Sequence, residues 1–171
     1  MQNAKTDRLL RAAILLLTGV LVFFIYSGIH ERVVVAGDTA PQFTIRADNG
    51  RTVSVPDFGG KLLVLNFWAT WCPPCVQETP SLSRFAAAYA GKGVVVLGIS
   101  VDKDENAYRA FLRKFNPAFL YAREFKLHED YGTFMYPETY IIDAKGKVLH
   151  KLAEPADWMD PRMTQLIDSL L

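Results

Sequence analysis

Cysteine, histidine and an excess of charge of either sign are what this sequence has least of. Its 171 residues include two cysteines, three histidines, 19 basic side chains and 18 acidic ones. Two cysteines are too few for a small scaffold held together by disulfides, and the balanced charge excludes the basic stripe expected of a nucleic-acid-binding protein. No low-complexity tract interrupts a composition that is 50% hydrophobic and 22% charged, which excludes intrinsic disorder. The length therefore fits one domain with an ordinary hydrophobic core.

One uncharged apolar run near the N-terminus is long enough to cross a bilayer. It covers residues 12–29, close to the roughly 20 residues that a spanning helix needs. Lys5, Arg8 and Arg11 precede it, and the positive-inside rule places that basic end in the cytoplasm. A cleaved signal peptide is the competing interpretation, but the run is long for one, and only a weak cleavage site at residues 34–36 follows it. The sequence therefore favours a retained membrane anchor.

This organisation predicts a single-pass protein of the cytoplasmic membrane. Residues 1–11 are expected in the cytoplasm, 12–29 in the membrane, 30–37 as a linker and 38–171 as a folded domain on the outer side. In a bacterium that side is the periplasm or the outer surface, where conditions are oxidising and disulfides persist.

Extended and helical patterns alternate through the exported part. Residues 48–50, Asp-Asn-Gly, join two short strand patterns and predict a hairpin. Apolar runs at 62–67 and 94–100 are typical of strands buried on both faces. A helical pattern follows each run, the first expected to end at Gly91, and Asp160-Pro161 predicts the start of the last helix. The order β-β-β-α-β-α-β-α-β-β-α predicts an α/β fold with three layers, α/β/α, around a mixed sheet.

The two cysteines stand where a buried strand gives way to a helix. The segment Trp-Cys-Pro-Pro-Cys ends at Cys75 and follows the strand at 62–67, so Cys72 is expected at or next to the helix N-terminus. Unpaired amide groups and the helix dipole stabilise a thiolate at that position, which predicts that Cys72 attacks disulfides. Cys75 lies one helical turn away and is predicted to resolve the mixed disulfide that forms on Cys72.

Two structural roles for the cysteines compete with this redox role. A structural zinc site needs four ligands, but the sequence has no second cysteine pair, and His30, His128 and His150 are scattered without ligand spacing. A purely structural disulfide would close a loop of two residues and restrict the unfolded chain very little. The strand-to-helix context and the oxidising compartment favour redox chemistry.

Two segments together carry a resemblance to a known family. Residues 64–75, VLNFWATWCPPC, and residues 136–143, YPETYIID, resemble the membrane-anchored thioredoxins of the TlpA-like and ResA-like family. These are extracytoplasmic thiol-disulfide oxidoreductases related to the ResA and CcmG proteins of cytochrome c maturation. The resemblance covers residues 38–171 and implies a thioredoxin fold with an added N-terminal β-hairpin and a central insertion. It implies no cofactor beyond a redox-active disulfide between Cys72 and Cys75.

The resemblance also implies a substrate-binding surface around the cysteines. Pro137 matches the cis-proline of the family, which lies beside the cysteines and leaves the backbone of Tyr136 free to pair with a substrate peptide by strand addition. Trp71 is expected at the edge of the site, and Pro73 and Pro74 are expected to contribute to the same surface.

Glu78 is the candidate for proton transfer. It lies three residues beyond Cys75, on the same side of the helix, where ResA-type proteins have an acid linked to the active site. A carboxylate near a thiol raises the thiol pKa and can accept its proton when Cys75 attacks. The helix dipole alone also favours an acid early in a helix, so both explanations stay open. Asn66 replaces the buried Asp of cytosolic thioredoxins, which leaves Glu78 or water as the proton acceptor.

The resemblance implies a protein-disulfide reductase that acts on exported proteins, whereas the residues themselves leave the direction of electron transfer open, and an oxidising pair is the alternative. Apocytochrome c is the substrate that the resemblance suggests, and a membrane electron donor of the thiol-reductase type is expected to reduce the protein again. We expect a monomer that binds neither metal nor nucleic acid.

Two other functions use the same cysteines. A Cu(I) delivery module would bind copper through Cys72 and Cys75, with His128 or His150 as a further ligand. A thiol peroxidase is disfavoured because Ala69 stands where such enzymes usually have a threonine, three residues before the reactive cysteine.

Overall fold

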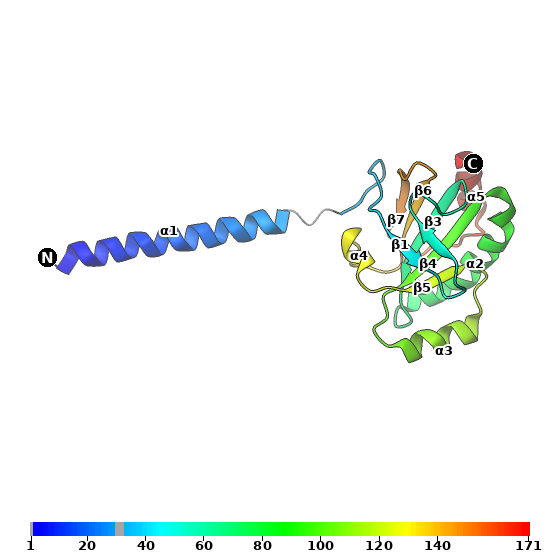
Figure 1. Ribbon diagram of the computed structural model, residues 1–171, viewed down its shortest axis with the longest axis horizontal. Helices are drawn as coiled ribbons and strands as arrows, with labels where there is room; N and C mark the ends of the chain where they lie inside the picture. The colour runs from blue at the N-terminus through cyan, green and yellow to red at the C-terminus, as the bar shows by residue number, and fades with distance from the viewer. Residues whose placement is uncertain (1, 30–32) are drawn as a thin grey trace. The chain divides into compact units, whose positions relative to one another are not determined.

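The chain forms an N-terminal helical unit and a second unit, Val33–Leu171 (Figure 1). The computed structural model describes residues 2–29 and 33–171. Of the linker predicted at 30–37, residues 30–32 lie outside the described residues.

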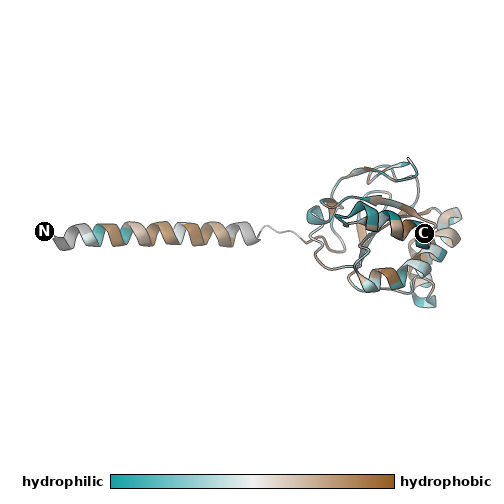
Figure 2. Cartoon of the chain, turned by 90° about the horizontal axis from the view of Figure 1, so that it is seen from below, coloured by the Kyte–Doolittle hydropathy of each residue, from teal (hydrophilic) through white to brown (hydrophobic). Residues whose placement is uncertain are grey.

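Helix α1, Gln2–Ile29, makes up the N-terminal unit and begins earlier than the predicted span at 12–29. Its segment Thr6–Ile25 is long and apolar enough to cross a membrane, a test that a signal sequence also passes. Figure 2 shows the hydrophobic colour along this helix.

A five-stranded mixed sheet organises the second unit. The strands lie in the order β5-β4-β3-β6-β7, with β3 parallel to β4 and antiparallel to β6. The predicted hairpin forms a separate two-stranded sheet, β1-β2. The bounds are β1 Thr44–Arg46, β2 Thr52–Ser54, β3 Leu62–Trp68, β4 Val94–Ser100, β5 Leu120–Arg123, β6 Glu138–Asp143 and β7 Val148–Leu152.

Three helices of this unit, α2, α3 and α5, begin after a residue whose side chain caps them, and α4 has no side-chain cap. The side chains of Asp104 and Asp160 accept hydrogen bonds from the first amides of α3 and α5, as Asp and other short polar residues do at N-caps. The first helix ends at Tyr89, just before Gly91 as predicted, and a 3₁₀ turn then leads to Gly93, which at φ 92° makes the left-handed turn. The bounds are α2 Pro73–Tyr89, the turn Ala90–Lys92, α3 Glu105–Phe115, α4 Leu127–Asp130 and α5 Pro161–Leu170.

The alternation of side chains along β3 divides the core between the two faces of the sheet. Leu62 and Val64 pack in one cluster with side chains of α2 and α5. Leu63 and Leu65 pack on the other side with the N-terminal segment, the β1-β2 hairpin and α4. Both faces are therefore covered, which is why every residue of β3 is buried. The element order and the mixed sheet confirm the predicted thioredoxin fold.

Candidate active site

The pairing of the central strands brings three distant chain segments to one end of the sheet. Trp68, the last residue of β3, pairs with Ser100, the last residue of the parallel strand β4. Phe67 pairs with Glu138, the first residue of the antiparallel strand β6. The loops that follow β3 and β4 and the loop that precedes β6 therefore meet at this end, and the first of them leads to the cysteines.

Cys72 and Cys75 form a disulfide at the N-terminus of α2, with Cα atoms 5.3 Å apart. Cys72 is the N-cap residue, and its Sγ accepts a hydrogen bond from the Cys75 amide at 3.3 Å. The residues between them, Pro73 and Pro74, have no amide hydrogen to donate. The predicted helix N-terminus is thus confirmed, with Cys75 N–H as the amide directed at the Cys72 sulfur.

The surroundings of this disulfide are apolar on one side and open on the other. Cys72 and Cys75 are 4% and 1% exposed and belong to a core cluster that includes side chains of α3. Trp71 is 63% exposed, and Pro73 is exposed beside it. Only a small part of the disulfide therefore reaches the surface, next to a large exposed ring.

The loop before β6 lies against Cys72, as predicted. The Tyr136–Pro137 peptide bond is cis. The carbonyl oxygen of Tyr136 is 3.4 Å from Cys72 Sγ, and the Tyr136 ring meets the Trp71 ring edge-on at 5.7 Å between centroids. The structure thus brings Trp71, Cys72 and Tyr136 together.

A buried carboxylate from the loop after β4 holds the segment that leads to Cys72. Asp102 is 1% exposed, and its oxygens accept hydrogen bonds from the Thr70 amide at 3.0 Å and the Thr70 hydroxyl at 2.6 Å. The Ser100 hydroxyl donates a further bond to Asp102 at 2.6 Å. Asp102 is not among the residues predicted for the site, because nothing near it in the chain marks a partner 32 residues away.

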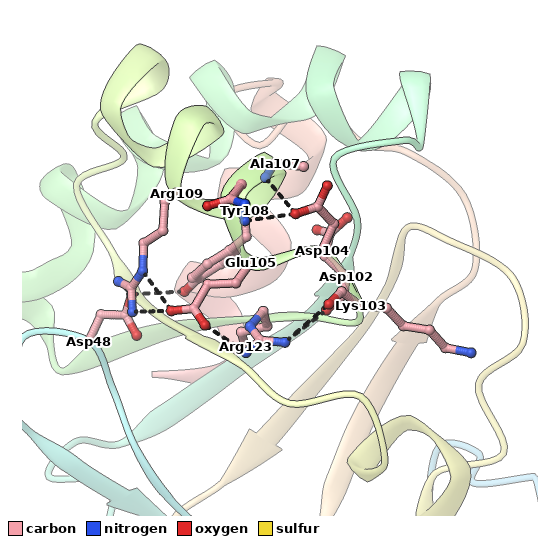
Figure 3. A network of polar contacts seen from close by, with 10 residues as sticks. Asp48, Asp102, Lys103, Asp104, Glu105, Ala107, Tyr108, Arg109 and Arg123 are labelled. Atoms are coloured by element: carbon pink, nitrogen blue, oxygen red, sulfur yellow. Dashed lines mark hydrogen bonds and ion pairs between the residues drawn. The ribbon is translucent and has the colours of Figure 1, made fainter.

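Ion pairs extend this anchoring toward α3 and the hairpin (Figure 3). Arg123 donates to the Asp102 carbonyl and pairs with Glu105 at 3.2 Å. Glu105 also pairs with Arg109, whose guanidinium reaches Asp48 in the turn of the hairpin. These contacts join β5, α3 and the β1-β2 turn around the loop that follows β4.

Glu78 lies on the buried side of α2 and is 5% exposed. Its carboxylate accepts hydrogen bonds from the Asn66 side-chain amide at 2.8 Å and from the Ala156 backbone amide at 3.1 Å. Burial raises its pKa from 4.5 to about 7, although the bonds from Ala156 and Asn66 act in the opposite direction. Glu78 can therefore exchange a proton near neutral pH. Asn66, the departure noted in the sequence, is its direct partner.

A third buried carboxylate holds the loop before β6. Glu138 accepts hydrogen bonds from the hydroxyls of Thr133 and Tyr140 and pairs with Lys151 at 2.9 Å. Thr133 is fully buried at the other end of this loop. The backbone that presents Tyr136 to Cys72 is thus fixed from both ends.

The described histidines show no arrangement typical of a metal site. His128 Nδ1 lies 2.9 Å from the Thr133 carbonyl oxygen, and His150 is in β7, paired with Ile141. Within residues 2–29 and 33–171, no three His, Cys, Asp or Glu side chains cluster in a way that could hold a metal ion.

Comparison with known proteins agrees with this site. The chain matches the AhpC/TSA family over residues 36–151. It is 32% identical over 154 residues to the thiol-disulfide oxidoreductase ResA of Bacillus cereus, which covers 86% of this chain and 89% of the relative. It is 39% identical over 115 residues to the thioredoxin-like protein YneN of Bacillus subtilis, covering 66% and 68%. A crystal structure of the thiol:disulfide interchange protein DsbE from Chlorobium tepidum superposes with a TM-score of 0.72 at 29% identity, covering 81% of this chain and 99% of that one.

A cysteine pair at a helix N-terminus of a thioredoxin fold, beside a cis-proline loop, defines the class of thiol-disulfide oxidoreductases. The chain belongs to the AhpC/TSA family and, within it, to the ResA-like thioredoxins.

Proposed function

We propose that this protein is an extracytoplasmic, membrane-anchored reductase of disulfides in exported proteins. The observation that carries the proposal is the position of Cys72: its sulfur caps α2, receives the Cys75 amide and lies 3.4 Å from the Tyr136 carbonyl oxygen. A cis-proline loop beside a reactive sulfur lets a substrate strand pair with the backbone of Tyr136 while its disulfide is attacked.

The reaction transfers two electrons from the Cys72–Cys75 dithiol to the substrate disulfide. The Cys72 thiolate attacks one substrate sulfur, forms a mixed disulfide and displaces the other substrate sulfur as a thiolate. Cys75 then loses its proton and attacks Cys72 Sγ, which releases the first substrate sulfur. Both substrate thiolates take up protons. The substrate ends as two thiols and the protein as the Cys72–Cys75 disulfide.

Glu78 supplies the base for the second step. A base works best when its pKa is near the operating pH, and the pKa of Glu78 is about 7. It follows Cys75 by one turn of α2, and Asn66 cannot replace it because an amide does not accept the thiol proton. Glu78 thus acts as the proton acceptor for Cys75.

The N-terminus of α2 favours the reducing direction. A strongly stabilised thiolate makes a thiol-disulfide protein oxidising, because it favours the reduced form. Pro73 and Pro74 occupy the first two positions of α2, and Pro74 removes an amide donor that could stabilise the Cys72 thiolate. The reduced form is correspondingly less favoured, and the protein passes its electrons on.

The apolar helix α1 supports the location of this chemistry. Lys5, Arg8 and Arg11 on its N-terminal side keep that end in the cytoplasm, so the unit that begins at Val33 faces the outside. A membrane dithiol donor restores the Cys72–Cys75 dithiol, and apocytochrome c is the first candidate substrate.

Trapping of the mixed disulfide tests this proposal. The full chain in detergent is reduced, and its reaction with a disulfide-bonded model protein is followed by thiol alkylation and mass spectrometry. Cys72→Ser should abolish the reaction, and Cys75→Ser should accumulate a covalent complex through Cys72. Full activity of Cys72→Ser, or a complex formed through Cys75 in the Cys72→Ser variant, would contradict the assignment.

A further inference from the structure

The surface next to Cys72 exposes large apolar side chains that the redox chemistry does not need. Phe134 is 61% exposed and Met135 is 69% exposed, in the loop that leads to Tyr136. Trp71, which is 63% exposed, contributes a third. Exposed apolar groups gathered in one place on a soluble domain are typical of a binding surface.

This exposure does not come from a loose loop. Thr133, directly before Phe134, donates its amide hydrogen to the His128 carbonyl at 2.8 Å and its hydroxyl hydrogen-bonds Glu138. Pro137, at the other end, is buried. The two apolar side chains are therefore held outward by a backbone that is fixed on both sides.

The rings form one continuous surface that begins at the reactive sulfur. From Trp71, adjacent to Cys72, ring centroids follow at 5.7 Å to Tyr136, 6.1 Å to His128 and 6.4 Å to Phe134. We call Trp71, His128, Phe134, Met135 and Tyr136 the aromatic surface. Any chain whose disulfide reaches Cys72 has to pass over or beside it.

Two exposed acidic residues follow His128 of the aromatic surface in the chain. Glu129 and Asp130 are exposed on α4, directly after His128, and Lys126 is the basic residue at the start of that helix. Burial raises the pKa of Tyr136, and the charges of Glu138 and Glu129 raise it further, in keeping with a position of Glu129 near this ring. A basic group on a bound chain is attracted there.

We propose that the aromatic surface selects substrates whose disulfide is flanked by an apolar side chain and a basic residue in an extended segment. This inference rests on the proposed reductase function and names the class of substrate for it. The apolar side chain packs on Phe134 and Met135, the basic residue lies near Glu129 and Asp130, and the backbone pairs with Tyr136.

Kinetics on matched peptides test the inference. Three peptides carry the same Cys-Ser-Gly-Cys disulfide and differ only in the two residues on each side of it. These residues are Phe-Lys in the first peptide, Phe-Glu in the second and Ser-Ser in the third. The reduced full chain in detergent is compared with Phe134→Ser, Met135→Ser and Glu129→Gln. Met159→Ser, which changes an exposed methionine outside the aromatic surface, is the matched control. The small disulfide 5,5′-dithiobis(2-nitrobenzoate) measures the reactivity of Cys72 itself.

The expected result is a loss of selectivity without a loss of reactivity. The unmodified protein should reduce the Phe-Lys peptide about tenfold faster, in kcat/KM, than the Ser-Ser peptide. Phe134→Ser and Met135→Ser should remove most of this preference, and Glu129→Gln should reduce the advantage of Phe-Lys over Phe-Glu. All variants should react with the small disulfide at the unmodified rate.

Two results would overturn the inference. One is an unmodified protein that reduces the three peptides equally fast, and the other is a preference for Phe-Lys that survives in Phe134→Ser and Met135→Ser. If the unmodified protein fails to reduce the small disulfide as well, the proposed function itself is wrong.

Discussion

Single buried carboxylates define the chemistry and the rigidity of this site. Glu78 lies in a buried position that raises its pKa to about 7, and Asp102 holds the Thr70 backbone two residues before Cys72. One group exchanges a proton and the other positions the chain, so their substitutions should have different consequences.

Glu78 makes the stability of the fold depend on pH. The pKa of Glu78 is about 7 in the folded protein and 4.5 when unperturbed. At pH values between 4.5 and 7, the folded state therefore binds the Glu78 proton more tightly than the unfolded state does. The contribution of Glu78 to the free energy of unfolding therefore falls as pH rises from 4.5 to 7. The unfolding free energy of the wild type, relative to Glu78→Gln, should fall by about 3 kcal/mol between pH 4 and pH 8 in urea titrations. The exposed Glu154→Gln is the control, and a pH-independent difference for Glu78→Gln would refute the raised pKa.

Removal of the Asp102 carboxylate should loosen the segment that carries Cys72. Asp102→Ala leaves the Thr70 amide, the Thr70 hydroxyl and the Ser100 hydroxyl without their acceptor, at an expected cost of about 3 kcal/mol in unfolding free energy. Asp102→Asn keeps one acceptor oxygen and should cost less. Urea unfolding measures both, and equal stability of Asp102→Ala and the wild type would show that this contact is not structural.

At the scale of the elements, the N-terminus of α2 controls the reactive sulfur. Its first two residues are prolines, so the Cys72 sulfur receives the Cys75 amide while position two of the helix offers no donor. An N-cap side chain normally accepts from the amide of the second or third helical residue. The missing donor is thus at Pro74.

Restoring that donor should make the protein more oxidising. Pro74→Ala supplies an amide that stabilises the Cys72 thiolate by about 1 kcal/mol, which lowers the pKa of the thiol and raises the reduction potential by roughly 20 mV. Titration in glutathione buffers measures the shift. Pro80→Ala, further along α2, is the matched control and should leave the reduction potential unchanged. A lower potential in Pro74→Ala would contradict this account of the helix N-terminus.

Sequence alone predicts those features that depend on neighbouring residues. The N-caps Cys72, Asp104 and Asp160 follow from local rules, and the order of elements follows from periodicity. The contacts of Asp102 with Thr70 and of Glu78 with Ala156 join residues 32 and 78 positions apart. No local pattern marks such pairs, because the tertiary packing of helices, loops and sheet brings them together.

At the scale of the whole molecule, the chain separates into a helix and a domain that carries the entire site. The residues of the candidate site lie in the unit that begins at Val33, and α1 contributes none of them. The chemistry therefore belongs to the unit that begins at Val33.

Deletion of α1 should change where the protein is found and leave its reactivity intact. A chain that starts at Val33 should be released from membranes, while the full chain sediments with them after a high-salt wash. Both forms should react with a small disulfide at the same rate. Cleavage of the full chain after α1 in the cell, seen by mass spectrometry of the mature protein, would show that the helix is a signal peptide.

The reduction potential of the Cys72–Cys75 pair tests the central claim most directly. The full chain in detergent is equilibrated with dithiothreitol and glutathione buffers, and its thiol state is read by alkylation and mass. A reversible two-electron transition at or below about −250 mV is the predicted result, because it makes the protein a reductant for exported disulfides. A potential near −120 to −180 mV, in the range of oxidases and isomerases, would contradict the account.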